Sequence, residues 1–143
     1  MVDRIVDTRL AMSQENVEIV RRIYDALNRE DWDAAFRNTH PDFEVTFVEG
    51  PRAGTHRGRE ALRAVVDDLR AGFESWMVEP VDFFESGDQV VVVVDNRLRP
   101  KGGTAGEFAY RNGSVFTVRN GAVVAVVGYP TPEHALDAVG LRE

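Results

Sequence analysis

The sequence predicts one α+β domain, in which a long curved sheet of mixed but mainly antiparallel strands wraps three N-terminal helices. The first half of the chain is dominated by helical apolar stripes, with one alternating strand among them. Four strand-like segments then follow one another, separated by short turns. With 143 residues, 43% of them hydrophobic, the chain is long enough for one domain with its own core.

Apolar residues at three- and four-residue spacing define the helices. We expect the first helix to begin with Ser13 as its N-cap and to end near residue 28, and a short second helix to be capped by Asp31. A third helix begins after Gly58. Residues 1–12 show no clear pattern, so we expect a disordered N-terminal extension there and a domain at 13–143. The apolar stripes are Val17, Val20, Tyr24 and Leu27 in the first helix, and Leu62, Val65, Val66, Leu69 and Phe73 in the third.

Alternation and β-branched residues define the strands. The first strand is expected around residues 43–48, followed by a loop from Glu49 to Gly54. Pro80 interrupts the second, at 78–85, and marks it as an edge strand. The remaining three strands are expected at 89–99, 107–119 and 122–129, with a flexible hairpin loop at 100–106 and a short closing helix from Pro132.

Composition excludes several classes of function. The chain has no cysteine, which excludes disulfides and thiolate chemistry, and its histidines at 40, 56 and 134 lack the spacing of metal ligands, so we expect no metal and no cofactor. A net charge of −7 disfavours nucleic acid as a partner. No apolar run is long enough to cross a membrane and no export signal is visible, so a cytoplasmic location is expected.

Four stretches carry a resemblance to a known family: residues 20–33, 40–45, 58–63 and 115–121, the last reading Val-Phe-Thr-Val-Arg-Asn-Gly. With this order of elements, the chain resembles the SnoaL-like proteins of the nuclear transport factor 2-like (NTF2-like) superfamily. The resemblance implies a cone-shaped fold whose wide mouth opens into an apolar cavity between helices and sheet. The superfamily includes isomerases, cyclases, dehydratases, epoxide hydrolases and non-catalytic binders, so the resemblance specifies the fold better than the activity.

Two catalytic sets of the superfamily are not retained. Where the steroid isomerases keep a tyrosine, a carboxylate base and an oxyanion-binding aspartate, this chain has Ile23, Phe47 and Ser114. The Asp-Arg-Asp set of limonene-epoxide-hydrolase-like members falls on Val94, Asn96 and Gly128. Asp95 and Arg97 are one residue out of register with that set, which places them on the opposite face of the strand.

Polar residues at period two predict one wall of a ligand pocket. Tyr110, Asn112 and Ser114 share a face of their strand, and Asn96 joins them if its strand follows the family register. The alternative is that these groups satisfy one another or bind water. The expected aromatic lining, for which plain core packing is the alternative, is Phe47, Phe116, Trp32 and Tyr24.

Two residues are candidates for proton transfer. Histidine is the commonest general base in enzymes, and His56 lies in a loop near the expected mouth, where Glu49 ends the first strand beside it. The alternative for each is an exposed loop side chain.

The last strand suggests a homodimer. In Ala122–Val127, Val124 and Val126 point one way, whereas Val123, Ala125 and Val127 point the other, with Val115 and Thr117 on that second face. A second copy of the same sheet is the simplest cover for it.

Three functions remain open from the sequence. The first is the binding of a ring-containing apolar small molecule. The second is an isomerase, cyclase or hydrolase acting on a polyketide- or terpenoid-like substrate, and the third is a structural or regulatory dimer whose cavity is filled. A cavity below about 300 Å³ would count against a drug-sized ligand.

Overall fold

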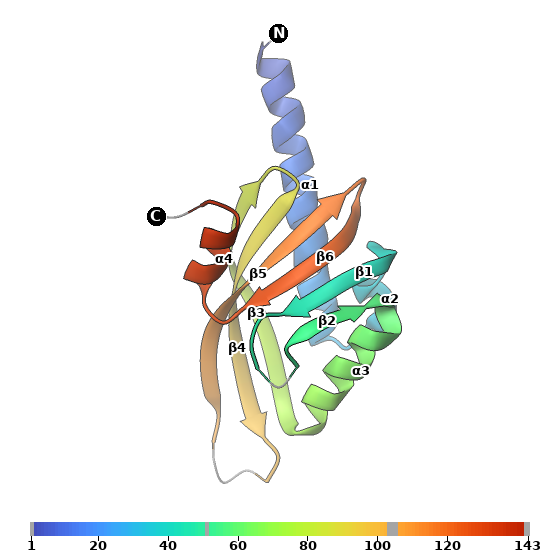
Figure 1. Cartoon of the computed structure of the whole chain (residues 1–143), viewed down its shortest axis with the longest axis vertical. Coiled ribbons are helices and arrows are strands. Elements are labelled where there is room, and N and C mark those ends of the chain that lie inside the picture. The colour runs from blue at the N-terminus through green and yellow to red at the C-terminus, as the bar shows by residue number, and fades with distance from the viewer. Residues whose placement is uncertain (1, 51, 103–105, 142–143) are drawn as a thin grey trace.

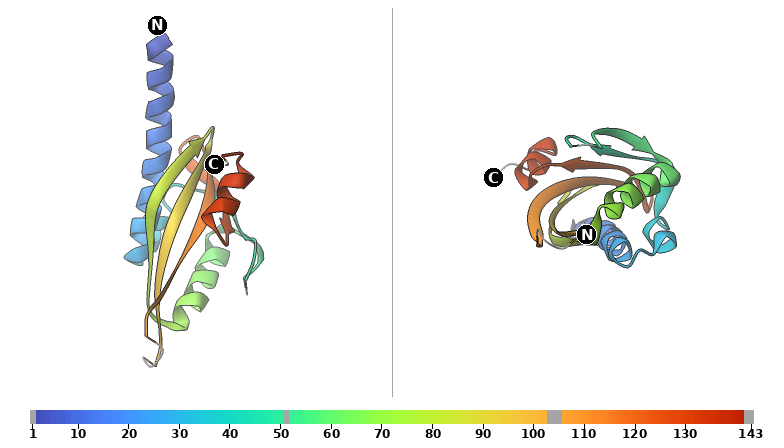
Figure 2. Two further views of the ribbon diagram at one scale, coloured as in Figure 1. Left: turned by 90° about the vertical axis from the view of Figure 1, so that its left-hand side faces the viewer. Right: turned by 90° about the horizontal axis from the view of Figure 1, so that it is seen from below.

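The computed structural model describes residues 2–50, 52–102 and 106–141, with side chains from residue 14 onward. In chain order the elements are helices α1 (Val2–Asn28) and α2 (Trp32–Ala35), strands β1 (Thr39–Phe47) and β2 (Gly54–Arg57), helix α3 (Gly58–Ala71), strands β3 (Phe73–Ser86), β4 (Gln89–Pro100), β5 (Phe108–Arg119) and β6 (Ala122–Tyr129), and helix α4 (Pro132–Ala138). The predicted α+β class is confirmed. The sheet curves around α1, α2 and α3, and α4 lies on its other face (Figures 1 and 2).

The sheet has six strands in the order β2-β1-β6-β5-β4-β3. Strands β3 to β6 form the predicted antiparallel meander, and β1 joins β6 in parallel, so the sheet is mixed as expected. β3 is an edge strand, and its register against β4 shifts between Pro80 and Asp82. Proline has no N–H to donate to the ladder, which explains the interruption at this point.

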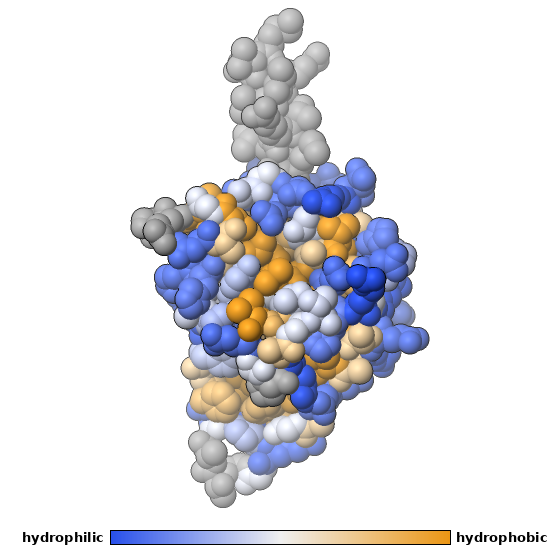
Figure 3. Space-filling model, in the orientation of Figure 1, coloured by the Kyte–Doolittle hydropathy of each residue, from blue (hydrophilic) through white to orange (hydrophobic). Residues whose placement is uncertain are grey.

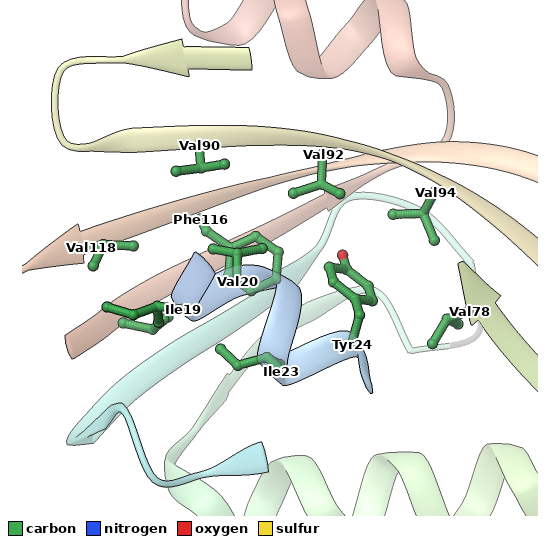
Figure 4. Close-up of a cluster of buried hydrophobic side chains, with 11 residues drawn as sticks. Ile19, Val20, Ile23, Tyr24, Val78, Val90, Val92, Val94, Phe116 and Val118 are labelled. Atoms are coloured by element: carbon green, nitrogen blue, oxygen red, sulfur yellow. The ribbon is translucent and has the colours of Figure 1, made fainter. Parts of the chain in front are cut away.

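The main core lies between α1 and the concave face of the sheet (Figure 4). Alternation along β4 points Val90, Val92 and Val94 toward α1. Burying such an aliphatic side chain contributes about 1.5–3 kcal/mol, so this contact stabilises the fold substantially. The helix residues that face the strand are Ile19, Val20, Ile23 and Tyr24.

Helix α4 packs on the convex face of the sheet. Its Ala135 contacts Val91 and Val115, all three buried. The helix lies so close to β5 that a Cβ at Gly113 would be 2.7 Å from the Ala135 Cβ, so only glycine fits there without a shift. The expectation that a second copy covers this face is therefore corrected in part, because α4 already covers the end of it nearest Val115.

The last hairpin departs from simple alternation. Thr117 pairs with Ala125 but Val118 pairs with Val123, so Val124 is an extra residue in β6. This bulge turns Val123 inward, where it joins the same core as Val126. The expectation that Val123 shares a face with Ala125 and Val127 is wrong, because a bulge reverses the alternation on one side of it.

Two element boundaries also differ from expectation. Helix α1 begins at Val2 and not at Ser13, and the separation of residues 1–12 from the domain stays a prediction. The segment Gly54–Arg57, expected as a loop, pairs with β1 as the short strand β2. Of the predicted loops at 49–54 and 100–106, residues 51 and 103–105 lie outside the described residues.

Candidate functional site

A cavity of about 170 Å³ lies between the helices and the concave face of the sheet. Helices α1, α2 and α3 supply one side of it, and strands β1, β3, β4, β5 and β6 supply the other. Most lining side chains are aliphatic or phenylalanine. The exceptions are Tyr24, Thr39, Arg70, Trp76, Asn96, Asn112 and Ser114.

Tyr24 of α1 lines the cavity and contacts the sheet. Its ring packs edge-on against Phe116, with ring centroids 5.7 Å apart, and its hydroxyl hydrogen-bonds to Ser114. Figure 4 shows the Tyr24 hydroxyl pointing toward β4 between Val92 and Val94. Burial raises the pKa of Tyr24 above its ordinary value, and the hydrogen bond to Ser114 only partly offsets this. Tyr24 therefore stays a neutral hydroxyl at physiological pH.

Two asparagines form a second polar pair on the sheet. The Asn96 Nδ2 donates to Oδ1 of Asn112 at 3.0 Å and lies 3.5 Å from the Tyr110 carbonyl oxygen. Asn96 is buried, with 3% of its surface exposed. The four side chains Tyr24, Ser114, Asn96 and Asn112 thus supply hydroxyl and amide groups, which form hydrogen bonds but carry no charge.

Arg70 and Trp76 form a third polar group that the sequence reasoning missed. The Arg70 Nη2 donates to the Leu27 carbonyl at the end of α1, at 2.9 Å, and the Arg70 Cζ lies 5.1 Å from the centroid of the Trp76 ring. A sequence signal was present, because Arg70 continues the four-residue spacing of Leu62 and Val66 on the inner side of α3.

Six of the eight predicted ligand-binding residues line the cavity: Tyr24, Phe47, Asn96, Asn112, Ser114 and Phe116. The other two do not. Trp32 stacks on Phe36 outside the cavity and lies beneath the Arg63 guanidinium. Tyr110 is 47% exposed, and its backbone oxygen is the group that lies near Asn96. Ligand contact by any of these residues stays a prediction.

The two candidates for proton transfer lie outside the lining. His56 is on β2, opposite Val45, and its Nε2 lies 3.0 Å from the Arg52 carbonyl oxygen. Its ring contacts Phe47, with centroids 5.8 Å apart, so Phe47 stands between His56 and the cavity. Glu49 is exposed beyond the end of β1. A catalytic role for either residue would require a substrate that reaches beyond Phe47.

The positions that carry catalysis in relatives are apolar or neutral here. Ile23, Phe47 and Ser114, which were compared above with the catalytic residues of the steroid isomerases, all line the cavity. Asp95 is turned to the opposite face, as the register predicted, where both its carboxylate oxygens accept hydrogen bonds from Arg111 at 2.6 and 3.0 Å. Its carboxylate therefore points away from the cavity and is paired there with Arg111.

Neither a metal cluster nor a membrane span is found in the described part of the chain. Over residues 2–50, 52–102 and 106–141, His, Asp and Glu side chains nowhere gather in a group of three that could hold a metal ion. Within the same ranges, no helix combines the length and apolar character needed to cross a bilayer.

Comparison with known proteins agrees with this architecture. A model of the SnoaL-like domain matches residues 20–126. An NTF2-like protein from Burkholderia xenovorans LB400 has 30% sequence identity and a TM-score of 0.65, over 89% of this chain and 96% of that chain. Comparison with the curated proteins gives no match.

Two further solved structures show the same fold at lower identity. TerC, co-crystallised with polyporic acid, has 21% identity and a TM-score of 0.74, over 87% of this chain and 97% of that chain. A "putative polyketide cyclase" from Xanthomonas campestris pv. campestris has 20% identity and a TM-score of 0.71, over 90% of this chain and 98% of that chain. With the matched domain spanning most of the chain and the cone-like arrangement of helices and sheet, this protein belongs to the SnoaL-like domain family.

Proposed function

We propose that this protein binds a small, largely apolar, ring-containing molecule in the cavity between its helices and its sheet. The observation that carries the proposal is an apolar cavity with a few convergent polar side chains, which is the usual composition of a small-molecule site. The pairs Tyr24–Ser114 and Asn96–Asn112 would orient the ligand by hydrogen bonds.

The cavity volume sets the size of this ligand. At about 170 Å³ it lies below the 300 Å³ expected for a drug-sized molecule. An apolar cavity of roughly 150 Å³ is enough to bind benzene in another protein. We therefore propose a molecule of one ring as the ligand that fits without rearrangement.

Substitution of Ser114 by leucine tests this proposal. The larger apolar side chain would occupy part of the cavity and remove the partner of the Tyr24 hydroxyl. A ligand present at about 100 times its Kd should stabilise the wild-type protein by about 2.7 kcal/mol. We expect toluene, phenol or cyclohexanol to raise the Tm of the wild-type protein, and Ser114→Leu to abolish the shift.

Ser75→Leu is the matched control, because Ser75 is exposed on β3 and outside the cavity lining. In the Ser75→Leu variant, the ligand should raise the Tm as much as it does in the wild-type protein. If no single-ring compound shifts the Tm or gives heat on titration into the wild-type protein, the binding proposal is wrong.

A second candidate function is catalysis on a polyketide- or terpenoid-like substrate, by an isomerase, cyclase or hydrolase. It is favoured by the family and by the name of the Xanthomonas structure. His56 or Glu49 would then have to supply the proton transfer. Turnover with a bell-shaped pH profile, lost in His56→Gln or Glu49→Gln, would support this function over simple binding. Turnover that survives both substitutions would exclude these two residues.

The third candidate is a structural or regulatory dimer. A cavity below about 300 Å³ counts against a drug-sized ligand, and the volume of about 170 Å³ therefore favours this candidate over the binding of a large ligand. Dimerisation through the convex face and the cytoplasmic location stay predictions.

A further inference from the structure

The cavity holds one charged side chain, and no ion pair compensates it. Arg70 is the single charged residue in the described lining, and no aspartate or glutamate lines the cavity. Eight other arginines form ion pairs with aspartate or glutamate. Among the described residues, Arg70 has no such partner. Although the protein as a whole carries a charge of −7, its cavity is positive.

Two N–H groups at this place also lack hydrogen-bond partners. The Nε of Arg70 and the Nε1 of Trp76 are both buried, and neither has a partner among the described residues. The two side chains are in contact, with the Arg70 Cζ 5.1 Å from the Trp76 ring centroid. A buried donor left without an acceptor destabilises the protein, and a charged donor does so more strongly. Because Arg70 and Trp76 both line the cavity, a ligand bound there is the candidate source of the missing acceptor.

The chemistry of these donors defines the class of ligand. Arginine and the tryptophan indole can only donate hydrogen bonds, so the ligand must bring oxygen acceptors. A guanidinium in apolar surroundings favours an anion over a neutral acceptor, because the interaction of opposite charges strengthens as water is excluded. The remaining wall is apolar, which suits a ring.

We propose that Arg70 and Trp76 bind the carboxylate of a single-ring carboxylic acid, whose ring lies against the apolar wall. This inference rests on the proposed binding function and makes it more specific. Trp76 is in register with Leu98, and Val78 on the same strand is in register with Asn96. The carboxylate end therefore lies on the sheet next to the Asn96–Asn112 pair, which leaves Tyr24 and Ser114 for the far end of the ligand.

The alternative to ligand binding is a purely structural role for Arg70. Its Nη2 donates to the Leu27 carbonyl, and under this alternative the role of Arg70 is to hold the end of α1 in place by this hydrogen bond. Under that alternative, loss of Arg70 would lower the binding affinity of every ligand equally. Under our proposal, it would lower the affinity for a carboxylate and leave that for a neutral ligand nearly unchanged.

The experiment is calorimetric titration with benzoate and with benzyl alcohol, its neutral counterpart. We expect wild-type protein to prefer benzoate, and Arg70→Gln to lower the benzoate affinity about ten- to a hundredfold while benzyl alcohol binding changes little. Arg63→Gln is the matched control, since Arg63 lies on the same helix, carries the same charge and is outside the cavity lining. It should leave both affinities unchanged.

Trp76→Phe keeps the test valid if Arg70→Gln does not fold. Phenylalanine retains an aromatic ring and removes the Nε1 donor, so the preference for benzoate should fall. Equal binding of both probes by the wild-type protein would overturn the carboxylate inference while leaving the binding function intact. A preference for benzoate that survives Arg70→Gln, or survives Trp76→Phe if Arg70→Gln does not fold, would overturn the assignment to these residues. If neither probe binds, the carboxylate inference is wrong, and the binding function is then decided by the thermal-shift experiment with toluene, phenol and cyclohexanol.

Discussion

Tyr24 shows how a single residue links the core of this protein to its cavity. It belongs to the buried cluster between α1 and the sheet, and it also lines the cavity and reaches Ser114. A buried phenol needs a hydrogen-bond partner, because an unsatisfied hydroxyl would be costly in apolar surroundings. The side chain is therefore held in place from both its apolar and its polar end, which makes it a rigid part of the wall.

The raised pKa of Tyr24 predicts how stability changes at alkaline pH. Below about pH 10, this tyrosine is neutral in both the folded and the unfolded chain and contributes no pH dependence. Above it, the unfolded chain loses the phenolic proton while the folded protein retains it, so the free energy of unfolding falls by up to about 1.4 kcal/mol for each pH unit. Tyr24→Phe should flatten this decline in urea titrations between pH 9 and about pH 11.

Few other groups contribute in this interval, and the main one is Tyr110, whose pKa is also raised by burial. Lys101 is the single lysine of the sequence, so tyrosines are the main groups that titrate in this interval. Tyr129→Phe is the control variant, and it should retain the decline. An unchanged slope in Tyr24→Phe would contradict the assignment of the buried phenol.

At the level of residues, the sequence predicted the neutral polar wall but not the charged group. Asn112 and Ser114 are two residues apart on one strand, so alternation alone places them on the same face. Arg70 and Trp76 lie on different elements and meet only because α3 packs beside β3. His56 was expected in a loop near the mouth, whereas pairing of β2 with β1 places it behind Phe47.

The strand β6 shows the limits of prediction for a secondary-structure element. Its apolar residues predicted the strand correctly, but alternation gave the wrong direction for Val123. The bulge at Val124 depends on how β6 pairs with β5, and such a register shift has no signal in a run of valine and alanine. An element rich in one residue type is therefore easy to locate and hard to orient.

The bulge predicts different costs for two neighbouring substitutions. Threonine has nearly the shape of valine but would place a hydroxyl where the valine had a methyl group. Val123 is 1% exposed in the core, so Val123→Thr should cost about 1–3 kcal/mol in the free energy of unfolding. Val124 is only partly buried, and Val124→Thr should stay within about 0.5 kcal/mol. Chemical denaturation of both variants is the measurement, and equal costs would contradict the bulge.

For the whole molecule, the main open surface is the convex face of the sheet. Helix α4 covers Val91 and Val115, but Ala125 and Val127 are only partly buried. In Figure 3, apolar surface gathers over the middle of the sheet beside α4, between hydrophilic regions. The ion pair of Asp95 and Arg111 lies on the same face of the sheet. An apolar centre with charges beside it is the usual anatomy of a protein interface.

This surface predicts a homodimer. In light scattering at micromolar concentration, the protein should have twice the 16.0 kDa mass of one chain. Val127→Lys should give a monomer, because it would place an unpaired charge in the apolar centre of the proposed interface. Val81→Lys, on the exposed part of the edge strand, is the control and should remain dimeric. A wild-type protein that scatters as a monomer would rule out this interface.

The order of helices and strands, the edge position of β3 and the apolar character of the concave face were all evident from the sequence. They follow from local periodicity, proline chemistry and alternation, which act over a few neighbouring residues. The bulge in β6, the cover that α4 provides, the position of His56 behind Phe47 and the meeting of Arg70 with Trp76 were decided by the tertiary structure. Each depends on contacts between segments far apart in the chain, and such contacts are set by strand register and packing that no local pattern records.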